Sequence, residues 1–314
     1  MQAEKKSVAV DSFAQPLDVP RVSASALTAT QFFEQYRKTS TPVVVTGLFE
    51  LNQAWDLDFL CVQLGDRVFP VRRYGRDRYT QDKRLWKDIG SSVESWSVPF
   101  TQYAQWLNDG TAQREDLYLG KCGLTSTPLG DAAELQAIIH QLNLTVPISG
   151  FNLWVGLAGH TTCLHYDPFD GTLIQLHGSK RLVLLPPSQL YNVYPFPIQR
   201  HLTQGLKSRS TYSQVYPDRP DLDAFPRFEQ ALQQRYEVIL WAGEVLFIPT
   251  GWWHEVTAVG EGVVCSVNRF WQIVPFYRSL QWSKLRAHLG SVLAVPHVVW
   301  EWGKAMQGAI ANNV

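Results

Sequence analysis

The chain has 314 residues, with 28 basic against 28 acidic side chains and 45% hydrophobic residues. A chain of this size buries roughly three quarters of its unfolded surface, so a core forms without disulfides or a structural metal. The composition excludes an intrinsically disordered protein, and the zero formal net charge excludes one that coats polyanions with its whole surface. Twelve Trp, twelve Tyr and fifteen Phe predict pockets lined by aromatic rings.

The cysteines and the apolar segments indicate the compartment. The four cysteines show neither Cys-x-x-Cys spacing nor the density of a disulfide scaffold, and no apolar signal segment precedes them. The longest charge-free apolar stretch, near 289–300, is about twelve residues, whereas a transmembrane helix needs roughly twenty. We therefore expect a soluble, intracellular, cytoplasmic protein with no membrane association.

The first half of the chain mixes helices and strands. Residues 1–25 are polar, contain Pro16 and Pro20, and predict an extended leader. The elements expected after it are a helix from Thr28, a strand over 42–47, a helix over 99–107, a strand over 116–120 and a helix over 132–142.

After Pro147 short β-rich runs follow one another with turn residues between them, which predicts an all-β sandwich or barrel. The segment 188–230 interrupts these runs, is rich in Pro, Tyr and Asp, and is long for a passive connection, so it suggests a binding insert. From Pro275 the pattern becomes helical, and we expect one helix over 275–295 and a second over 300–311, both with apolar stripes.

Three residues predict a metal site. His165 and Asp167 are two apart at the mouth of a strand, so their side chains point the same way. His254 opens a later strand, which a jelly roll places beside the first. Two His and one carboxylate are typical of non-haem Fe(II) oxygenases. His-x-Asp alone is a common pattern, and a zinc site from His160, Cys163 and His165 lacks a second pair of ligands.

The residues around this triad carry a resemblance to a known family. The segments GHTTCLHYDPFDGTLIQLHGSKRLVLLPP, GEVLFIPTGWWHEV and CSVNRFW resemble the cupin-like Jumonji-C oxygenases, and within them the asparaginyl hydroxylases that act on hypoxia-inducible factor. The resemblance implies a mainly β fold with flanking helices, a double-stranded β-helix or cupin jelly roll. The domain would span 26–274 with its core at about 110–271, followed by C-terminal helices over 275–314 that form a homodimer in related hydroxylases.

The resemblance also implies roles for individual residues. His165, Asp167 and His254 match the catalytic Fe(II) ligands. A lysine, two hydroxyl groups and an amide match the contacts of the cosubstrate 2-oxoglutarate; these are Lys180, Tyr118, Thr162 and Asn268. Gly171 is a departure, because the asparaginyl hydroxylases have a second asparagine there, and this puts the contacts of the C1 carboxylate in doubt.

The function that follows is a dioxygenase dependent on Fe(II), 2-oxoglutarate and O2 that hydroxylates a C–H bond, with a protein or peptide side chain as the expected substrate. Hydroxylation of a tRNA nucleoside or a small molecule, and N-demethylation, would use the same chemistry. A non-enzymatic cupin binding protein and a zinc-dependent isomerase or hydrolase are the alternatives from other classes.

A basic stretch over 67–88 is interleaved with aromatic residues and could bind a nucleic acid backbone or an acidic peptide. Its plainer interpretation is a hairpin whose charges face water. In a chain without net charge it is the strongest candidate for a surface that steers the substrate.

Overall fold

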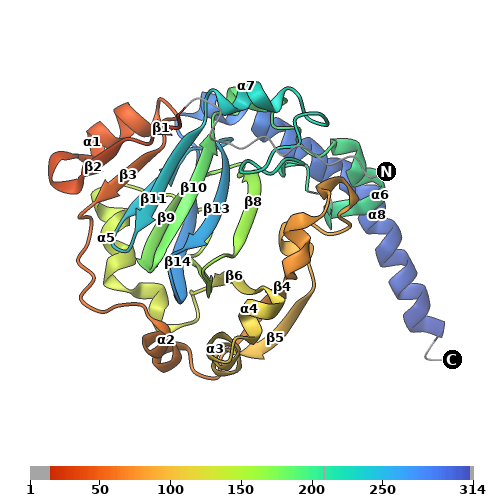
Figure 1. Cartoon of the computed structure of the whole chain (residues 1–314), viewed down its shortest axis with the longest axis horizontal. Helices are drawn as coiled ribbons and strands as arrows, with labels where there is room; N and C mark the ends of the chain where they lie inside the picture. Colours follow the sequence, from red (N-terminus) through yellow and green to blue (C-terminus); the bar gives the residue numbers. More distant parts are fainter. Residues whose placement is uncertain (1–14, 208, 312–314) are drawn as a thin grey trace, which may run out of the picture.

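The computed structural model of the protein describes residues 15–207 and 209–311, so residues 1–14 of the predicted leader lie outside it. Two β-sheets face each other and enclose the centre of the molecule, with helices on the outside (Figure 1). The smaller sheet contains, in spatial order, β1 (Leu17–Asp18), β11 (Tyr236–Trp241), β10 (Ser179–Leu185), β13 (Trp253–Val259) and β8 (Thr161–Tyr166).

The larger sheet adds an outer wing to the barrel. In spatial order it contains β2 (Arg21–Ser23), β3 (Val43–Thr46), β12 (Val245–Ile248), β9 (Asp170–His177), β14 (Val263–Trp271), β7 (Asn152–Leu157), β6 (Leu117–Gly123), β4 (Val68–Arg73) and β5 (Ser95–Pro99). This arrangement confirms the predicted mainly β, cupin-like fold.

The helices and strands predicted before residue 147 are present. Thr28 starts the first helix through a capping box, in which its hydroxyl accepts from the Gln31 N–H at 3.2 Å while the Gln31 side chain accepts from the Thr28 N–H at 2.9 Å. The helices are α1 (Ala29–Phe32, continued by a wider turn over Phe33–Arg37), α2 (Leu57–Leu64), α3 (Phe100–Asn108), α4 (Thr111–Glu115), α5 (Ala133–Gln141), α6 (His201–Gln204), α7 (Phe228–Leu232) and α8 (Trp282–Ala311).

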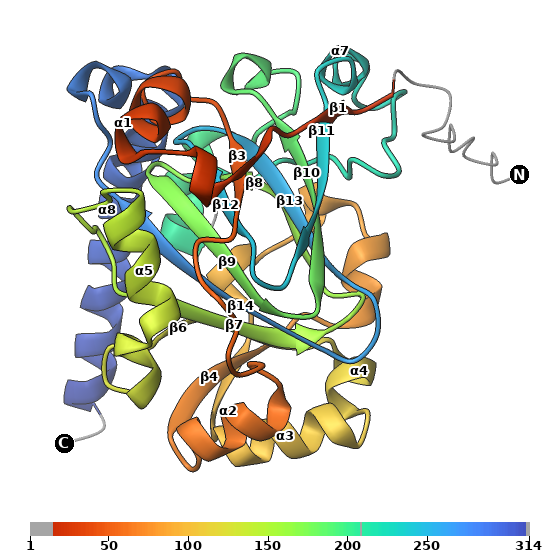
Figure 2. The same ribbon diagram turned by 90° about the vertical axis from the view of Figure 1, so that its left-hand side faces the viewer.

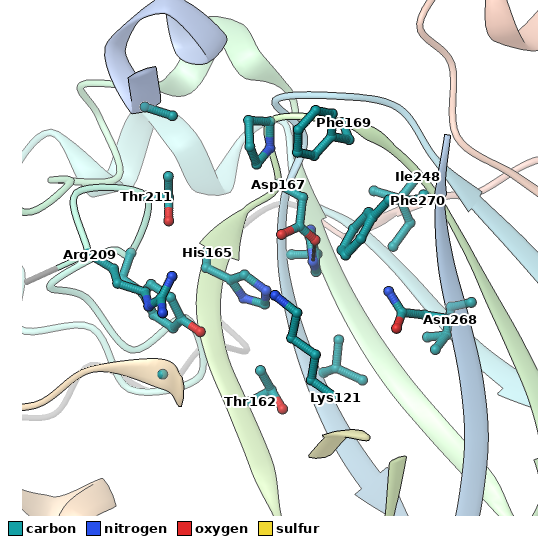
Figure 3. A pocket seen from close by; sticks show the side chains of 18 of the residues that line it. Lys121, Thr162, His165, Asp167, Phe169, Arg209, Thr211, Ile248, Asn268 and Phe270 are labelled. Carbon is teal, nitrogen blue, oxygen red and sulfur yellow. Dashed lines mark ion pairs between the residues drawn. The ribbon is translucent and has the colours of Figure 1, made fainter. Parts of the chain in front are cut away.

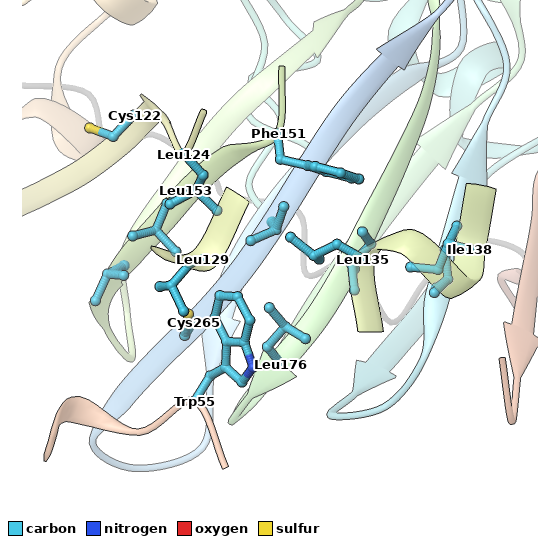
Figure 4. Close-up of a cluster of buried hydrophobic side chains, with 14 of the residues drawn as sticks. Trp55, Cys122, Leu124, Leu129, Leu135, Ile138, Phe151, Leu153, Leu176 and Cys265 are labelled. Atoms are coloured by element: carbon cyan, nitrogen blue, oxygen red, sulfur yellow. The ribbon is translucent and has the colours of Figure 1, made fainter. Parts of the chain in front are cut away.

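The largest core lies on the outer face of the larger sheet. Leu153 and Leu176 project from β7 and β9 against Leu135 and Ile138 of α5, and the Trp55 ring packs beside them (Figure 4). Figure 2 shows α5 beside this face of the sheet and α2 and α3 at its lower end. Because strand side chains alternate, the same strands leave their other face for the barrel interior.

The predicted insert covers the smaller sheet. Between β10 and β11 the chain forms short turns, α6 and α7, and Phe228 of α7 is buried against Tyr166 of β8 and Trp253 of β13. This packing closes one side of the barrel and brings residues near 210 to its opening. The insert is therefore part of the cavity wall.

A buried ionic cluster secures the turn between β8 and β9. Arg278 donates to both carboxylate oxygens of Asp170 at 2.8 Å, and Arg37 lies 3.5 Å from the same carboxylate. Thr250 adds a backbone N–H at 3.0 Å. All three charged side chains are buried, so the cluster joins the N-terminal helix, the barrel and the segment before α8.

The C-terminal prediction needs a correction. Instead of two helices there is one continuous helix, α8, with Pro296 in its interior. A proline removes one backbone hydrogen bond and commonly bends a helix rather than ending it, and here the helical residues on both sides continue the ladder. The C-terminal part of α8 extends beyond the body of the molecule (Figure 1). Among the helices of the described residues, none has the length and apolarity that crossing a bilayer requires.

Candidate metal and cosubstrate site

His165, Asp167 and His254 meet at the opening of the barrel. β8 and β13 are antiparallel neighbours, and His165 is directly opposite His254 in their register. Ligand atoms from the three side chains all lie within 4.8 Å of one another, and Figure 3 shows Asp167 above the His165 ring. The tertiary structure thus brings together the three residues that the sequence separates by as many as 89 positions.

Each histidine presents the same nitrogen to this point. The Nδ1 atom of His165 lies 2.9 Å from the Cys163 carbonyl oxygen, and that of His254 lies 3.0 Å from the Trp252 carbonyl oxygen. A carbonyl only accepts, so each Nδ1 carries a proton and each Nε2 keeps a lone pair. Such backbone acceptors orient histidines that bind metals.

The charges also suit a cation. Burial, with a smaller contribution from the neighbouring His254, lowers the pKa of His165 to about 4, so its imidazole is neutral at pH 7. Burial raises the pKa of the Asp167 carboxyl, but its proximity to His165 and His254 outweighs burial, and the pKa of this carboxyl is lowered overall. Two neutral imidazoles and one carboxylate are a donor set that fits Fe(II).

An irregularity in β8 adds Thr162 to the same cavity. Thr162 and His165 are three residues apart, and a regular strand would direct them to opposite faces. The register with β13 shifts here: two steps from His254 to Val256 correspond to three steps from His165 to Thr162. This β-bulge places both side chains on the cavity wall.

Lys180 lies deeper in the cavity than the triad and has no acidic partner among the described residues. Its side chain is 3% exposed, and its amino group donates to the Ser266 hydroxyl and lies 3.4 Å from the Tyr118 hydroxyl. Burial lowers the pKa of Lys180 to about 8. A buried cation without a counter-charge is a site where an anionic ligand gains strong, desolvated hydrogen bonds.

Tyr118 is held in place from behind. Its ring is stacked on His160 with a centroid distance of 3.7 Å, and the His160 Nδ1 atom lies 3.0 Å from a carboxylate oxygen of Asp116. The Tyr79 hydroxyl donates to the other oxygen of Asp116 at 2.8 Å. His160 therefore supports the cavity wall in this structure.

Asn268 faces the cavity from β14. Its carbonyl oxygen accepts a hydrogen bond of 2.7 Å from the Trp154 indole, which leaves its amide NH2 group for a ligand. Gly171 also lines the cavity, and a Cβ atom built there would meet only the Phe270 ring at 3.6 Å and the Ile248 carbonyl oxygen at 3.9 Å. The glycine thus leaves open space where the family resemblance would place an amide.

All seven predicted site residues line one cavity of about 510 Å³. Sequence reasoning missed other residues of this cavity or its wall; these include Lys121, Trp154, His201, Arg209 and Ser266. Ser266 could have been found from strand alternation, because it is two residues before Asn268. Trp154 lies opposite Ser266 in the regular pairing of β7 with β14. The remaining residues depend on the bulge in β6 and on the insert, which carry no such pattern.

The basic stretch over 67–88 matches the predicted water-facing hairpin only in part. β4 and β5 pair as a hairpin, but the segment between them forms short turns in which Lys83 and Trp86 are buried. Lys83 donates to the Val215 carbonyl oxygen at 2.7 Å. It follows that this lysine anchors the stretch to the insert and is not a surface charge.

Comparison with known proteins agrees with this geometry. A cupin-like domain family matches residues 29–276. The chain is 36% identical over 287 residues to lysine-specific demethylase JMJ31 of Arabidopsis thaliana, covering 79% of this chain and 49% of that protein. It is 38% identical over 278 residues to human tRNA wybutosine-synthesizing protein 5, covering 83% of this chain and 80% of the relative. With lysine-specific demethylase 8 of Xenopus tropicalis the identity is 28% over 263 residues, covering 81% and 52%.

The chain spans about half the length of the plant and frog relatives and four fifths of the human one. These relatives confirm the predicted resemblance to Jumonji-C proteins and support 2-oxoglutarate-dependent oxygenase chemistry, whereas the narrower resemblance to asparaginyl hydroxylases stays a prediction. On its fold, its clustered triad and these matches, the chain belongs to the cupin-like, Jumonji-C domain family.

Proposed function

We propose that the protein is an Fe(II)- and 2-oxoglutarate-dependent dioxygenase that hydroxylates a C–H bond. The observation that carries the proposal is a triad of metal-binding type in the same cavity as a buried, uncompensated lysine. A metal next to a buried cation matches a cosubstrate that has a chelating end and a distal carboxylate.

In this proposal His165, Asp167 and His254 hold the iron. Lys180 binds the distal carboxylate of 2-oxoglutarate, with help from the hydroxyls of Thr162 and Tyr118, and Asn268 donates to its C1 end. When bound, iron, 2-oxoglutarate and O2 supply the oxidising power that inserts oxygen into the C–H bond, with succinate and CO2 as products. The chain itself orients the cosubstrate, and the part of the cavity around Lys180 is enclosed by buried side chains, among them Tyr118 and Leu173.

The test measures succinate formed from 2-oxoglutarate under air with added Fe(II), together with anaerobic binding of the cosubstrate. We expect His165→Ala to lose the metal-dependent absorption of the bound cosubstrate and Lys180→Ala to lose binding, while the exposed His140→Ala behaves as wild type. Activity without O2 would instead indicate a zinc-type isomerase or hydrolase. Absence of binding and turnover with iron present would favour a non-enzymatic binding protein.

For the substrate we propose a side chain of a protein or peptide, as in the demethylases named among the relatives. A tRNA nucleoside is the second candidate, favoured by the 38% identity to a tRNA wybutosine-synthesizing protein. The two are separated by comparing which pool, unmodified tRNA or histone peptides, increases succinate formation. Stimulation by tRNA alone would overturn the protein-substrate proposal.

The 67–88 stretch is the proposed contact for nucleic acid. Arg67, Arg76 and Lys87 are exposed there, while Arg73 and Arg84 are paired with acidic side chains. If this surface binds tRNA, Arg76→Glu should weaken binding and reduce its dependence on salt. An unchanged affinity would remove this surface from consideration.

We also propose a homodimer through α8. Its exposed apolar side chains form an extended surface of the kind that marks interaction sites; they include Leu285, Leu289, Val292, Val295, Val299, Trp300 and Trp302. Light scattering should report a dimer for the wild type and a monomer for Leu289→Arg. An unchanged mass would contradict the proposal.

A further inference from the structure

The cavity is strongly cationic. Among its lining side chains, four are basic, namely Arg72, Lys121, Lys180 and Arg209, whereas the only carboxylate is Asp167 of the triad. With a divalent metal bound to Asp167 and the cosubstrate bound to Lys180, the other basic side chains still make the opening of the cavity positively charged. Such a cavity concentrates anions.

Lys121 reaches this cavity through a β-bulge. Tyr118 and Lys121 are three residues apart on β6 and would face opposite sides of a regular strand. The register with β7 shifts between Leu119 and Cys122, so that three steps on β6 correspond to two on β7, from Val155 to Leu153. Both Tyr118 and Lys121 therefore line the same cavity.

The bulge holds Lys121 in an uncommon backbone conformation. Its φ is 57°, in the left-handed region that favours glycine. Neighbouring side chains stabilise this geometry: Arg72 donates to the Gly120 carbonyl oxygen, and the Trp154 ring lies so close to Gly120 that a Cβ atom there would be 2.9 Å from it. Strained residues that their surroundings hold in this way are concentrated at functional sites.

The Lys121 amino group has no ion-pair or hydrogen-bond partner in residues 15–207 and 209–311, and its side chain is exposed. Figure 3 shows it extending along the cavity toward His165 and Asp167. A bulge, a strained backbone and an unpaired cation thus coincide at the opening beside the triad.

We propose that Lys121 binds an anionic group of the substrate, a carboxylate or a phosphate, next to the bond that is oxidised. It is a specificity residue, and it makes the enzyme select substrates that carry a negative charge close to the reacting carbon. This assignment rests on the proposed function, because it takes Asp167 and Lys180 as already occupied by metal and cosubstrate.

The test places a paramagnetic ion in the site and detects which small molecules come near it. Protein loaded with Mn(II) and saturating 2-oxoglutarate without O2 is mixed with acetate, methyl phosphate or neutral acetamide, and the relaxation of their methyl protons is measured by NMR. Wild type should relax at least one anion much more than acetamide. Comparing acetate with methyl phosphate distinguishes a carboxylate-selective from a phosphate-selective site.

In Lys121→Met the enhancement should fall about ten-fold, the factor expected for one lost charge-assisted hydrogen bond. Lys121→Arg should retain it, and Lys38→Met, a lysine paired with Glu34 outside the cavity, should match wild type. Equal relaxation in wild type and Lys121→Met, or equal relaxation by acetamide, would overturn the assignment. Titrating 2-oxoglutarate in the same samples distinguishes failure of the Lys121 assignment from failure of the proposed function. If wild type does not bind 2-oxoglutarate, the proposed function itself fails.

Discussion

Replacing Lys180 by methionine should stabilise the ligand-free protein and abolish its response to 2-oxoglutarate. Burial lowers the pKa of this lysine from 10.5 to about 8, and each pKa unit corresponds to about 1.4 kcal/mol. At pH 7 the buried charge therefore opposes folding by about 3 kcal/mol. Methionine has a similar length without the charge, so Lys180→Met should raise the free energy of unfolding by up to that amount. Without the cation, cosubstrate affinity should fall about a hundred-fold or more.

The stability difference between wild type and Lys180→Met should depend on pH. Below about pH 8 the lysine is charged in both the folded and the unfolded chain, and the unfavourable contribution is complete. Between pH 8 and 10.5 the unfolded chain binds a proton that the folded chain has lost, so the stability of wild type rises with pH relative to Lys180→Met. The difference between the two proteins should narrow by about 1 kcal/mol from pH 7 to pH 9.

Urea unfolding at pH 7 and pH 9, with and without 2-oxoglutarate and Mn(II), measures both effects. Wild type should gain stability when the cosubstrate is added, whereas Lys180→Met should not. A ligand-free variant that is less stable than wild type at pH 7 would refute the reasoning about the buried charge. A variant that keeps the full stabilisation by 2-oxoglutarate would refute the role of Lys180 in binding.

Three further substitutions test the structure around the site. Gly156→Ala places a Cβ atom against the Tyr118 ring, so calorimetry should find weaker 2-oxoglutarate binding, and unchanged affinity would contradict the packing. Asp170→Ala leaves Arg278 buried without its carboxylate, and urea unfolding should show a loss of about 3–5 kcal/mol; a loss below about 1 kcal/mol would mean that the cluster is unimportant. Lys121→Gly relieves a positive φ and should raise the free energy of unfolding by about 1 kcal/mol, so a decrease would show that the backbone there is unstrained.

Strand periodicity made several features of this protein predictable. His165 and Asp167 point the same way because they are two residues apart on an extended segment, and the structure has both at the barrel opening. A threonine cap at Thr28 or Thr30 predicted the start of the first helix, and the structure has Thr28 as that cap. The short β-rich runs after Pro147 indicated an all-β sandwich or barrel. All of these signals are local, since they depend on the geometry of a few consecutive residues.

Local sequence patterns did not predict which residues these side chains contact or whether they are buried. The sequence treats Lys180 as an ordinary strand lysine unless the family pattern is known, and only the closed barrel shows that it is buried beside Ser266 and Tyr118 without an acidic neighbour. Likewise the burial of Lys83 results from the insert that folds over it. Burial is a property of distant chain segments that come together, so it has no local signature.

The sequence alone determined the kinds of element, the donor residues of the candidate metal site and their spacing along each strand. The tertiary structure decided which residues share the cavity. The bulges in β8 and β6 direct Thr162 and Lys121 into the cavity, whereas in regular strands their side chains would point to the opposite face. It also decided that α8 continues through Pro296. A bulge or a tolerated proline depends on hydrogen bonds and packing with neighbouring segments, and these exist only once the chain has folded.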